Sequence, residues 1–350
     1  LKFSNTGTRL WATYYGGNDI DIGYSITCDG TGNVFVTGPT CSSDFPVLDA
    51  GTYYDGMLDG HNDVFILKFD NTGKQLWSTY YGGSGSGERY SIACDKTGNV
   101  FVIGYTNSAD FPTLNAGTYY DGTLDGISDA FILKFGNTGT LLWATYYGGN
   151  NYEHFLTATN DNITIDASDN VYISFETSSN IITTLNSDSI CGYMDSIYGG
   201  YWDCFITKFT NTGVLLWASY IGGTSNDFRT PLSVDNAGNL FMGGEFTRYT
   251  NSSSLPMLNP GGGAYYDDTP NGNDDSFMLK FVPCATKPPV VNFSVNDSII
   301  CAGTCVTFTD LTTNYPLSWK WTFHGGTPTS SIQKNPAVCY DTAGTYKVTL

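Results

Sequence analysis

The chain has 350 residues, of which 41% are apolar and 15% are aromatic, so it can form a sizeable hydrophobic core. Its formal net charge of −18 argues against nucleic acid or an anionic membrane surface as a partner, because both require basic patches on the protein. No apolar run approaches the ~20 residues that a membrane-spanning helix needs.

Residue usage favours strands and tight turns over helices. The chain contains 41 Gly, 25 Tyr and 21 Phe, and nearly all of its 33 acidic residues are Asp. Aromatic residues are enriched in strands, whereas Asp and Gly are enriched in turns. No segment shows a 3.6-residue periodicity over the length of a helix. We therefore expect an all-β fold that is built from many short strands.

One motif recurs along the first 281 residues. Its clearest copy consists of the strand-like segment Asp63–Phe69, the turn Asn71–Gly73 and the aromatic segment Leu76–Gly83. Self-similarity at a long, nearly constant period predicts a repeat architecture. The recurring tryptophans stand 66, 66 and 74 residues apart, at Trp11, Trp77, Trp143 and Trp217.

Each copy is interpreted as four strands, which in the clearest case are 76–81, 90–94, 100–105 and 130–135. An Asp-x-x-Gly-Asn turn, such as Asp95–Asn99, joins the second strand to the third. Its Asp side chain can accept hydrogen bonds from the backbone amides of the turn, and its Gly supplies a positive φ. The same turn recurs at Asp29 and Asp235 and, with Asp169 in place of Gly, at Asp166. Four short antiparallel strands per copy predict the blades of a β-propeller.

The chain resembles the SBBP, or β-propeller, repeats of secreted bacterial proteins in the order of three motifs: Trp-x-x-Tyr-Tyr-Gly-Gly, Asp-x-x-Gly-Asn-Val-Phe-Val and Asp-x-Phe-Ile-x-Lys-Phe. The resemblance covers about residues 1–281 and implies four complete blades, at about 8–69, 74–135, 140–209 and 214–281. Residues 1–3 are then a leftover strand. A ring of roughly six to eight blades would need more chain upstream, whereas in a smaller ring the leftover strand could complete the last blade.

After residue 281 the repeat pattern stops. Residues 282–289 contain three prolines, which cannot extend a sheet, so we expect a linker there. Residues 290–350 contain segments of period-two alternation, such as Thr304–Thr309 and Trp319–Phe323. Together with the closing segment Gly344–Leu350, these residues resemble a PKD domain. The resemblance implies an immunoglobulin-like β-sandwich that is truncated at its end.

An acidic, glycine-rich loop precedes the last strand of each copy. Several carboxylates in such a loop could bind Ca²⁺, which takes roughly six to eight hard oxygen ligands, although the spacing does not match an EF-hand loop. The alternative is that the Asp at the start of each last strand accepts hydrogen bonds from backbone amides. The short run Asp19–Asp21 is interpreted as a solvated loop, because its carboxylates do not recur. The candidate metal-binding residues are Asp55, Asp59, Asp63, Asp121, Asp125, Asp129, Asp195, Asp203, Asp267 and Asp275.

The chain lacks the signatures of a catalytic site, so we expect no enzymatic activity. It contains no Gly-x-Ser-x-Gly or His-Glu-x-x-His motif. The recurring tryptophans are expected to pack one blade against the next. Trp202, which occurs in one copy only, is the candidate for an exposed ligand contact. The arginines stand at unrelated repeat positions, at Arg9, Arg89, Arg229 and Arg248.

Nine cysteines, four of which lie between positions 284 and 339, indicate disulfides and an oxidising compartment. The chain has no Cys-x-x-Cys pair and only three His, which argues against a zinc site. Cys305 and Cys339 precede inward-facing residues of strands that neighbour each other in an immunoglobulin-like sheet. Both would therefore face outward, and we expect them to form a disulfide. The other candidate bridges are Cys191–Cys204, which would staple the loop of the third copy, and Cys284–Cys301.

Together, the two resemblances imply a secreted or cell-surface protein, because proteins of this kind are modular surface or adhesion components, often in gliding bacteria. The first hypothesis is a non-enzymatic scaffold or adhesion module that binds a protein or a polysaccharide. The second is a Ca²⁺-dependent adhesin, in which Ca²⁺ would be the only cofactor. The third is the accessory region of a secreted hydrolase whose catalytic domain lies outside these residues.

Overall fold

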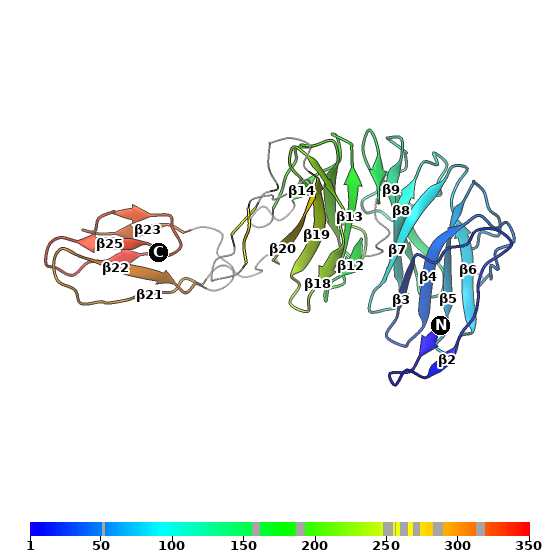
Figure 1. Cartoon of the computed structure of the whole chain (residues 1–350), viewed down its shortest axis with the longest axis horizontal. Helices are drawn as coiled ribbons and strands as arrows, with labels where there is room; N and C mark the ends of the chain where they lie inside the picture. The colour runs from blue at the N-terminus through cyan, green and yellow to red at the C-terminus, as the bar shows by residue number, and fades with distance from the viewer. Residues whose placement is uncertain are drawn as a thin grey trace. The chain divides into compact units, whose positions relative to one another are not determined.

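The computed structural model describes residues 1–50, 53–155, 162–186, 193–247, 255, 257–259, 265–268, 274–282, 290–312 and 319–350. Within these ranges the regular elements are all strands and none is a helix, which confirms the all-β prediction (Figure 1). The chain divides into two compact units. The repeat unit contains the described residues up to Val282, and the second unit contains those from 290 to 350.

The repeat unit contains two regular four-stranded antiparallel sheets whose strands follow chain order. Strands of the first sheet are β3 (Ser25–Cys28), β4 (Val34–Thr40), β5 (Asp63–Phe69) and β6 (Gln75–Tyr81). Strands of the second sheet are β7 (Gly87–Cys94), β8 (Val100–Thr106), β9 (Asp129–Phe135) and β10 (Leu141–Tyr147). A short separate pair, β1 (Lys2–Phe3) and β2 (Arg9–Trp11), precedes them.

Two further sheets keep the same order with a divided first strand. In the third sheet, β11 (Glu153–His154) and β12 (Ile163–Ile165) both pair with β13 (Val171–Thr177). The sheet continues through β15 (Asp203–Phe209), β16 (Leu215–Ile221) and β14 (Leu185–Asn186). In the fourth sheet, β17 (Asn226–Phe228) and β18 (Leu232–Val234) both pair with β19 (Leu240–Thr247), which pairs with β20 (Asp274–Phe281).

The strand that carries the recurring Trp is hydrogen-bonded to the preceding copy. In the first sheet Lys68 of β5 lies opposite Trp77 of β6, and the hairpin between them turns at Gly73, which has a φ of +93°. The predicted blades, each of which began with the Trp strand, are therefore offset by one strand from the sheets. The leftover strand follows the same rule, because Lys2 lies opposite Trp11. Its strand partner is the first Trp strand, whereas the sequence left open that residues 1–3 complete the last blade of a smaller ring.

The Asp-x-x-Gly-Asn turns form as predicted. Asp95 Oδ1 accepts hydrogen bonds from the amides of Thr97, at 2.8 Å, and Asn99, at 2.9 Å. Gly98 has a φ of +83°, and Asp169, which replaces Gly in the third copy, has a φ of +61°. Asp tolerates this left-handed backbone conformation better than most residues do. These turns are thus determined by local sequence alone.

Aromatic rings connect each sheet to the next, as predicted for the recurring tryptophans. Trp77 in the first sheet packs against Phe135 of the second, with 5.9 Å between ring centroids. Trp143 packs against Phe209 of the third sheet in the same way, at 6.4 Å. The sheets stand side by side in chain order (Figure 1). The tryptophan positions are therefore used for packing between blades.

A buried lysine makes a second connection at each of the same junctions. Lys68 Nζ donates a hydrogen bond to the carbonyl oxygen of Asn137 at 3.0 Å, and Lys134 Nζ donates one to that of Asn211 at 2.6 Å. Burial lowers the pKa of both ammonium groups, and a nearby carboxylate opposes this shift in each case. The Lys and the Asn-Thr-Gly turn of the recurring motif therefore recur because they join neighbouring blades.

The second unit is a β-sandwich of two three-stranded sheets. One sheet contains β21 (Phe293–Val295), β22 (Thr304–Asp310) and β25 (Ala337–Tyr340). The other contains β23 (Trp321–Phe323), β24 (Ser330–Ser331) and β26 (Val348–Thr349). The alternating strand residues meet in its core, which consists of Val306, Phe308, Trp321, Phe323, Val338 and Tyr340.

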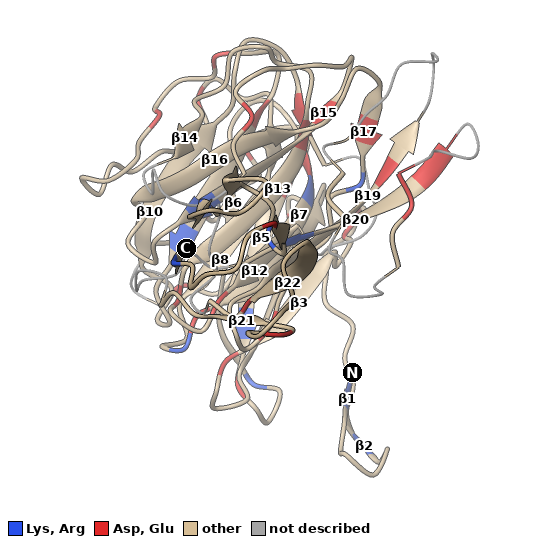
Figure 2. Cartoon of the chain, turned by 90° about the vertical axis from the view of Figure 1, so that its left-hand side faces the viewer, with Lys and Arg blue, Asp and Glu red and all other residues tan. Residues whose placement is uncertain are grey.

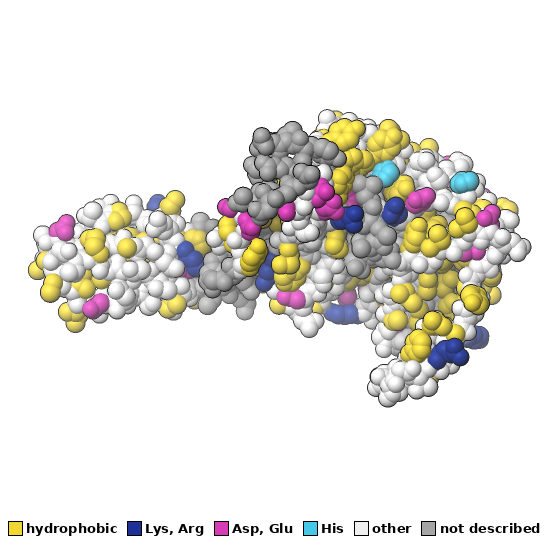
Figure 3. Space-filling model, in the orientation of Figure 1, with side chains coloured by type: hydrophobic (Ala, Val, Ile, Leu, Met, Phe, Trp, Pro, Cys, Tyr) yellow, Lys and Arg dark blue, Asp and Glu magenta, His cyan; other side chains and the backbone are white. Residues whose placement is uncertain are grey.

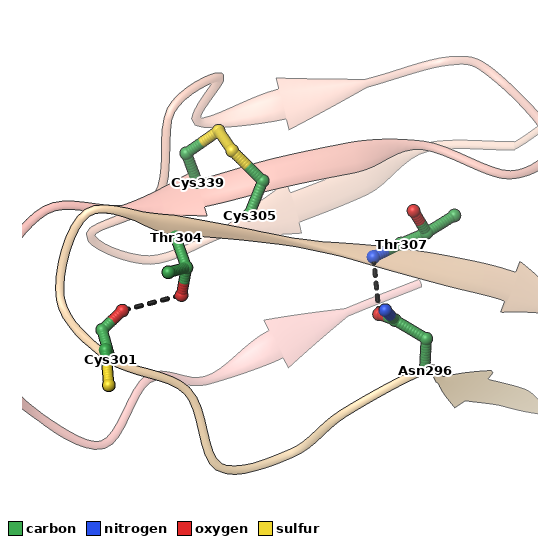
Figure 4. The surroundings of a disulfide bond; sticks show 6 residues. All are labelled: Asn296, Cys301, Thr304, Cys305, Thr307 and Cys339. Atoms are coloured by element: carbon green, nitrogen blue, oxygen red, sulfur yellow. Dashed lines mark hydrogen bonds between the residues drawn. A yellow bond between two sulfur atoms is a disulfide. The ribbon is translucent and has the colours of Figure 1, made fainter.

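The predicted Cys305–Cys339 disulfide is present (Figure 4). The two residues lie directly opposite each other on the paired strands β22 and β25, on the side that faces away from the core. The other two candidate bridges involve Cys191 and Cys284, which lie outside the described residues. Their expected partners, Cys204 and Cys301, carry free thiols. Cys204 is fully buried in an apolar cluster, where it acts as a small hydrophobic residue, and Cys301 is exposed.

Candidate functional site

The aspartates at the start of β5, β9 and β15 are buried and hold the acidic loops in place. Asp63, Asp129 and Asp203 are each at most 1% exposed. Each uses Oδ2 to accept a hydrogen bond from the backbone of its own loop, as expected for an Asp that fixes the start of the last strand. The donors are the amides of Asp59, Asp125 and Gly199, at 3.0, 3.0 and 2.8 Å respectively.

The remaining candidate metal-binding residues do not converge on one point. Asp55, Asp121 and Asp195 each accept a hydrogen bond from the amide two residues further along the chain. The side chains of Asp59, Asp125 and Asp267 are exposed, and Asp275 lies in β20 opposite Phe246. Acidic residues occupy loops and strand ends of the repeat unit (Figure 2). Within the described ranges, no three Asp, Glu, His or Cys side chains form a group that could hold a metal ion.

A second set of carboxylates was missed by sequence analysis. Asp21, Glu153 and Asp227 each stand four residues after the second glycine of a Gly-Gly pair and accept a hydrogen bond from its amide. These amides belong to Gly17, Gly149 and Gly223, at 2.7, 3.1 and 3.0 Å. The carboxylate of Asp21 therefore recurs, and its interpretation as part of a solvated loop was wrong. The constant offset from the Gly-Gly pair was the available signal.

Two of these carboxylates, Glu153 and Asp227, face an aspartate at the start of a strand of the preceding sheet. Asp129 of β9 and Glu153 of β11 are both 0% exposed, and a Cβ atom on Gly148 would lie 2.6 Å from an oxygen of each. The two carboxyl groups therefore lie close together. Burial raises the pKa of both groups, as expected for two acids that share a dry site.

The next junction repeats this arrangement with two aspartates. Asp203 of β15 and Asp227 of β17 both flank Gly222, whose Cβ would lie 2.8 Å from Asp203 Oδ1 and 2.9 Å from Asp227 Oδ2. Burial raises the pKa of Asp227 to about 7 and that of Asp203 to about 6, and the charge of Asp203 also raises the pKa of Asp227. Because both groups are almost fully buried, this pair belongs to the blade junction and is not accessible to a substrate.

The junction between the first and second sheets lacks the second carboxyl. Gly87 stands in its place, and a cavity of about 10 Å³ lies between it and Asp63. Such a cavity has room for about one water molecule. Asp63 Oδ1 is buried there without a hydrogen-bond partner among the described residues, and burial raises the pKa of Asp63 to about 6.

A row of half-buried aromatic rings crosses the second, third and fourth sheets. We call Tyr105, His154, Trp202 and Phe228 the aromatic row. Successive ring centroids are 4.6, 5.6 and 6.5 Å apart. Tyr152, which is 37% exposed, contacts both His154 and Trp202. Figure 3 shows one face of the repeat unit, on which hydrophobic, cationic and acidic side chains lie next to one another. Trp202, the candidate contact residue, contacts three of these rings, which are those of Tyr152, His154 and Phe228.

Two arginines stand beside the aromatic row at equivalent positions of their sheets. Arg89 lies two residues after Gly87, and Arg229 lies two residues after Asp227, which holds the equivalent position in the fourth copy. Arg89 and Arg229 have φ values of +59° and +60°, and this left-handed conformation costs a non-glycine residue about 1–2 kcal/mol. Arg229 forms an ion pair with Glu245 and its side chain is 62% exposed. The prediction that the arginines occupy unrelated repeat positions was therefore wrong for these two.

Comparison with known proteins agrees with the two architectures. Residues 10–46 and 76–112 match the β-propeller repeat family, and residues 286–350 match the PKD domain family. The chain thus combines SBBP β-propeller repeats with a PKD domain. Both are non-catalytic kinds of domain, and together they indicate a protein-interaction or surface module.

One relative is an uncharacterized WD repeat-containing protein of Acanthamoeba polyphaga mimivirus. It is 26% identical to this chain over 227 residues, a match that covers 57% of the chain and 16% of the relative. The chain therefore spans a small part of that protein's length. Among the described residues there is no helix long and apolar enough to cross a membrane.

Proposed function

We propose that this chain is a non-enzymatic binding module of an extracellular or cell-surface protein, and that it holds a protein or glycan partner on the aromatic row. The observation that carries the proposal is the partial exposure of four contiguous rings contributed by three successive sheets. Half-buried aromatic rings supply large contact areas and are enriched among residues that dominate binding energy. Trp202 lies between His154 and Phe228 and is therefore the central anchor.

The carboxyl groups support binding over catalysis. Asp129, Asp203 and Asp227, whose pKa is raised and which would otherwise be candidates for acid–base chemistry, are at most 1% exposed and occupy blade junctions. A general acid must reach its substrate within hydrogen-bonding distance, and these groups have no such access. An oxidising environment is supported by the Cys305–Cys339 disulfide on the outer side of the second unit.

The test is a binding survey with the whole chain, by biolayer interferometry, against immobilised cell-surface polysaccharides and extracellular proteins. We expect saturable binding to at least one of them and a loss of about 30-fold in affinity in Trp202→Ala, since an anchor residue contributes about 2 kcal/mol or more. Tyr201→Ala is the matched control, because Tyr201 is 76% exposed and adjoins Trp202 in sequence. Equal affinities of the two variants, at unchanged melting temperatures, would refute the proposal, as would the absence of any saturable partner.

A further inference from the structure

We propose that the aromatic row binds an extended, uncharged polysaccharide, and that Arg89 and Arg229 donate hydrogen bonds to its hydroxyl groups from the two ends of the row. This inference rests on the proposed binding function and names the class of ligand. Tyr105 and His154 stack face to face and His154 meets Trp202 edge-on, so the row can offer both ring faces and ring edges to the apolar faces of successive sugar units. Guanidinium and carboxylate groups beside them supply the donors and acceptors that hydroxyl groups require.

Hydrogen bonds of the buried carboxyl groups and of the neighbouring backbone fix the chain beside the rings. His154 and Phe228 directly follow Glu153 and Asp227, whose side chains accept hydrogen bonds from Gly149 and Gly223. Trp202 directly precedes Asp203, and its carbonyl oxygen accepts a hydrogen bond from the amide of Asp227 at 2.8 Å. The backbone beside three of the four rings is therefore fixed, and a fixed platform binds with a smaller loss of conformational entropy.

The backbone around the two arginines is irregular at equivalent places. The pairing of β7 with β8 shifts register between Glu88 and Ser91, on either side of Arg89. In the fourth sheet β17 ends at Phe228 and β18 begins at Leu232, so Arg229 lies in the interruption. Bulges of this kind redirect a side chain and occur next to functional sites. Left-handed backbone at a non-glycine residue is likewise concentrated at sites of function.

The chain places the two arginines at opposite ends of the row, because Arg89 follows Glu88, which lies opposite Tyr105, and Arg229 follows Phe228. Arg89 influences the titration of both Tyr105 and His154, the first two rings. Burial, together with the positive charge of Arg89, lowers the pKa of His154, which favours its neutral form. Arg229 directly follows Phe228, the last ring, and pairs with Glu245. A ligand that reaches both arginines must therefore extend along the whole row.

The charges argue for an uncharged ligand. A protein of net charge −18 repels a polyanion, while the two arginines at the row disfavour a cationic one. A proline-rich peptide is the other uncharged chain that docks on aromatic surfaces. We favour the polysaccharide because Arg229 and Glu245 present charged donor and acceptor groups together, which suits hydroxyl groups that both donate and accept hydrogen bonds.

The experiment measures binding of neutral oligosaccharides to the whole chain by calorimetry. The probes are cello-, xylo- and manno-oligosaccharides of two and six units, with a polyuronate hexamer and a proline-rich decapeptide for comparison. We expect at least one neutral hexamer to bind at least tenfold more tightly than its dimer. Arg89→Ala and Arg229→Ala should each weaken hexamer binding about tenfold, while Arg9→Ala, which alters an arginine in β2, should not.

Each other outcome has a definite meaning. If no neutral hexamer shows saturable binding, or if the polyuronate or the peptide binds more tightly, the inference about the ligand is wrong. The proposed function would nevertheless stand if any partner from the binding survey lost affinity in Trp202→Ala. If Trp202→Ala changed no interaction at all, both the function and the ligand class would be wrong. An equal loss in the Arg9→Ala control would also overturn the role given to Arg89 and Arg229.

Discussion

The buried carboxyl pairs predict that the repeat unit is more stable in weak acid than at neutral pH. The decisive perturbation is Asp227→Asn. An Asn side chain has the shape of protonated Asp, so its oxygen can accept the hydrogen bond from Gly223 and its amide can donate one to Asp203. The variant therefore mimics the protonated pair at every pH, whereas the wild-type pair must ionise as the pH rises.

The sign follows from the direction of the pKa shift. Burial raises the pKa of Asp227 from 3.8 to about 7 in the folded protein, so folding favours its protonated form. The stability contributed by this group is fully present below pH 3.8 and is lost as the pH rises toward and past 7. A shift of about three pKa units corresponds to an upper limit of about 4 kcal/mol, at ~1.36 kcal/mol per unit. For a unit of this size that is at most about 8 °C in melting temperature.

The assay is differential scanning calorimetry of the wild type and the variant from pH 4.5 to 8.5. We expect similar melting temperatures at pH 4.5 and a variant that is several degrees more stable at pH 8.5. Asp125→Asn removes an exposed carboxylate and should leave the pH profile parallel to that of the wild type. If the pH profile of Asp227→Asn were also parallel to that of the wild type between pH 5 and 8, the inference that burial raises the pKa of Asp227 would be refuted.

Three further perturbations test other parts of the structure. Gly148→Ala places a Cβ 2.6 Å from oxygens of the buried acid pair and should destabilise the repeat unit by about 1–3 kcal/mol, whereas Gly30→Ala, where no atom lies within 4 Å, should be neutral by urea unfolding. Replacing Cys305 and Cys339 by Ser opens a loop with a sequence separation of 34 and should lower the stability of the second unit alone, by about 4 kcal/mol, in thermal unfolding. Adding EDTA or Ca²⁺ should shift neither melting transition by more than about 1 °C, since many of the loop carboxylates bond to backbone amides.

The outcomes that contradict these expectations are specific. A neutral Gly148→Ala would mean that the acid pair can move apart at no cost. A loss of stability in the repeat unit on removing the disulfide would mean that the two units do not unfold separately. A rise in melting temperature with Ca²⁺ that EDTA reverses would restore the calcium-dependent adhesin, with ligands drawn from the acidic loops.

Local features of this protein were predictable because they depend on residues close together in the chain. The turn at Asp95 forms from five consecutive residues, and its capping bonds and positive φ follow from the residue types alone. The alternation of each strand placed Cys305 and Cys339 on the outer face, since a period of two decides which face a residue occupies, and the resemblance to an immunoglobulin-like sheet made their strands neighbours. The repeat of the tryptophans likewise predicted that they pack blades together.

The sequence by itself thus determined the all-β repeat architecture, the turns and one disulfide. The tertiary structure decided which strand completes which sheet, because a hairpin at Gly73 returns the Trp strand to the preceding copy. It also brought Asp129 to Glu153 and aligned the rings from Tyr105 to Phe228, both of which depend on contacts between neighbouring sheets. The acid pairs recur at one spacing, because Glu153 follows Asp129 and Asp227 follows Asp203 by 24 residues, whereas the rings of the aromatic row are not evenly spaced along the chain. The physical reason is that strand pairing is local in sequence, whereas the packing of one sheet against another is not.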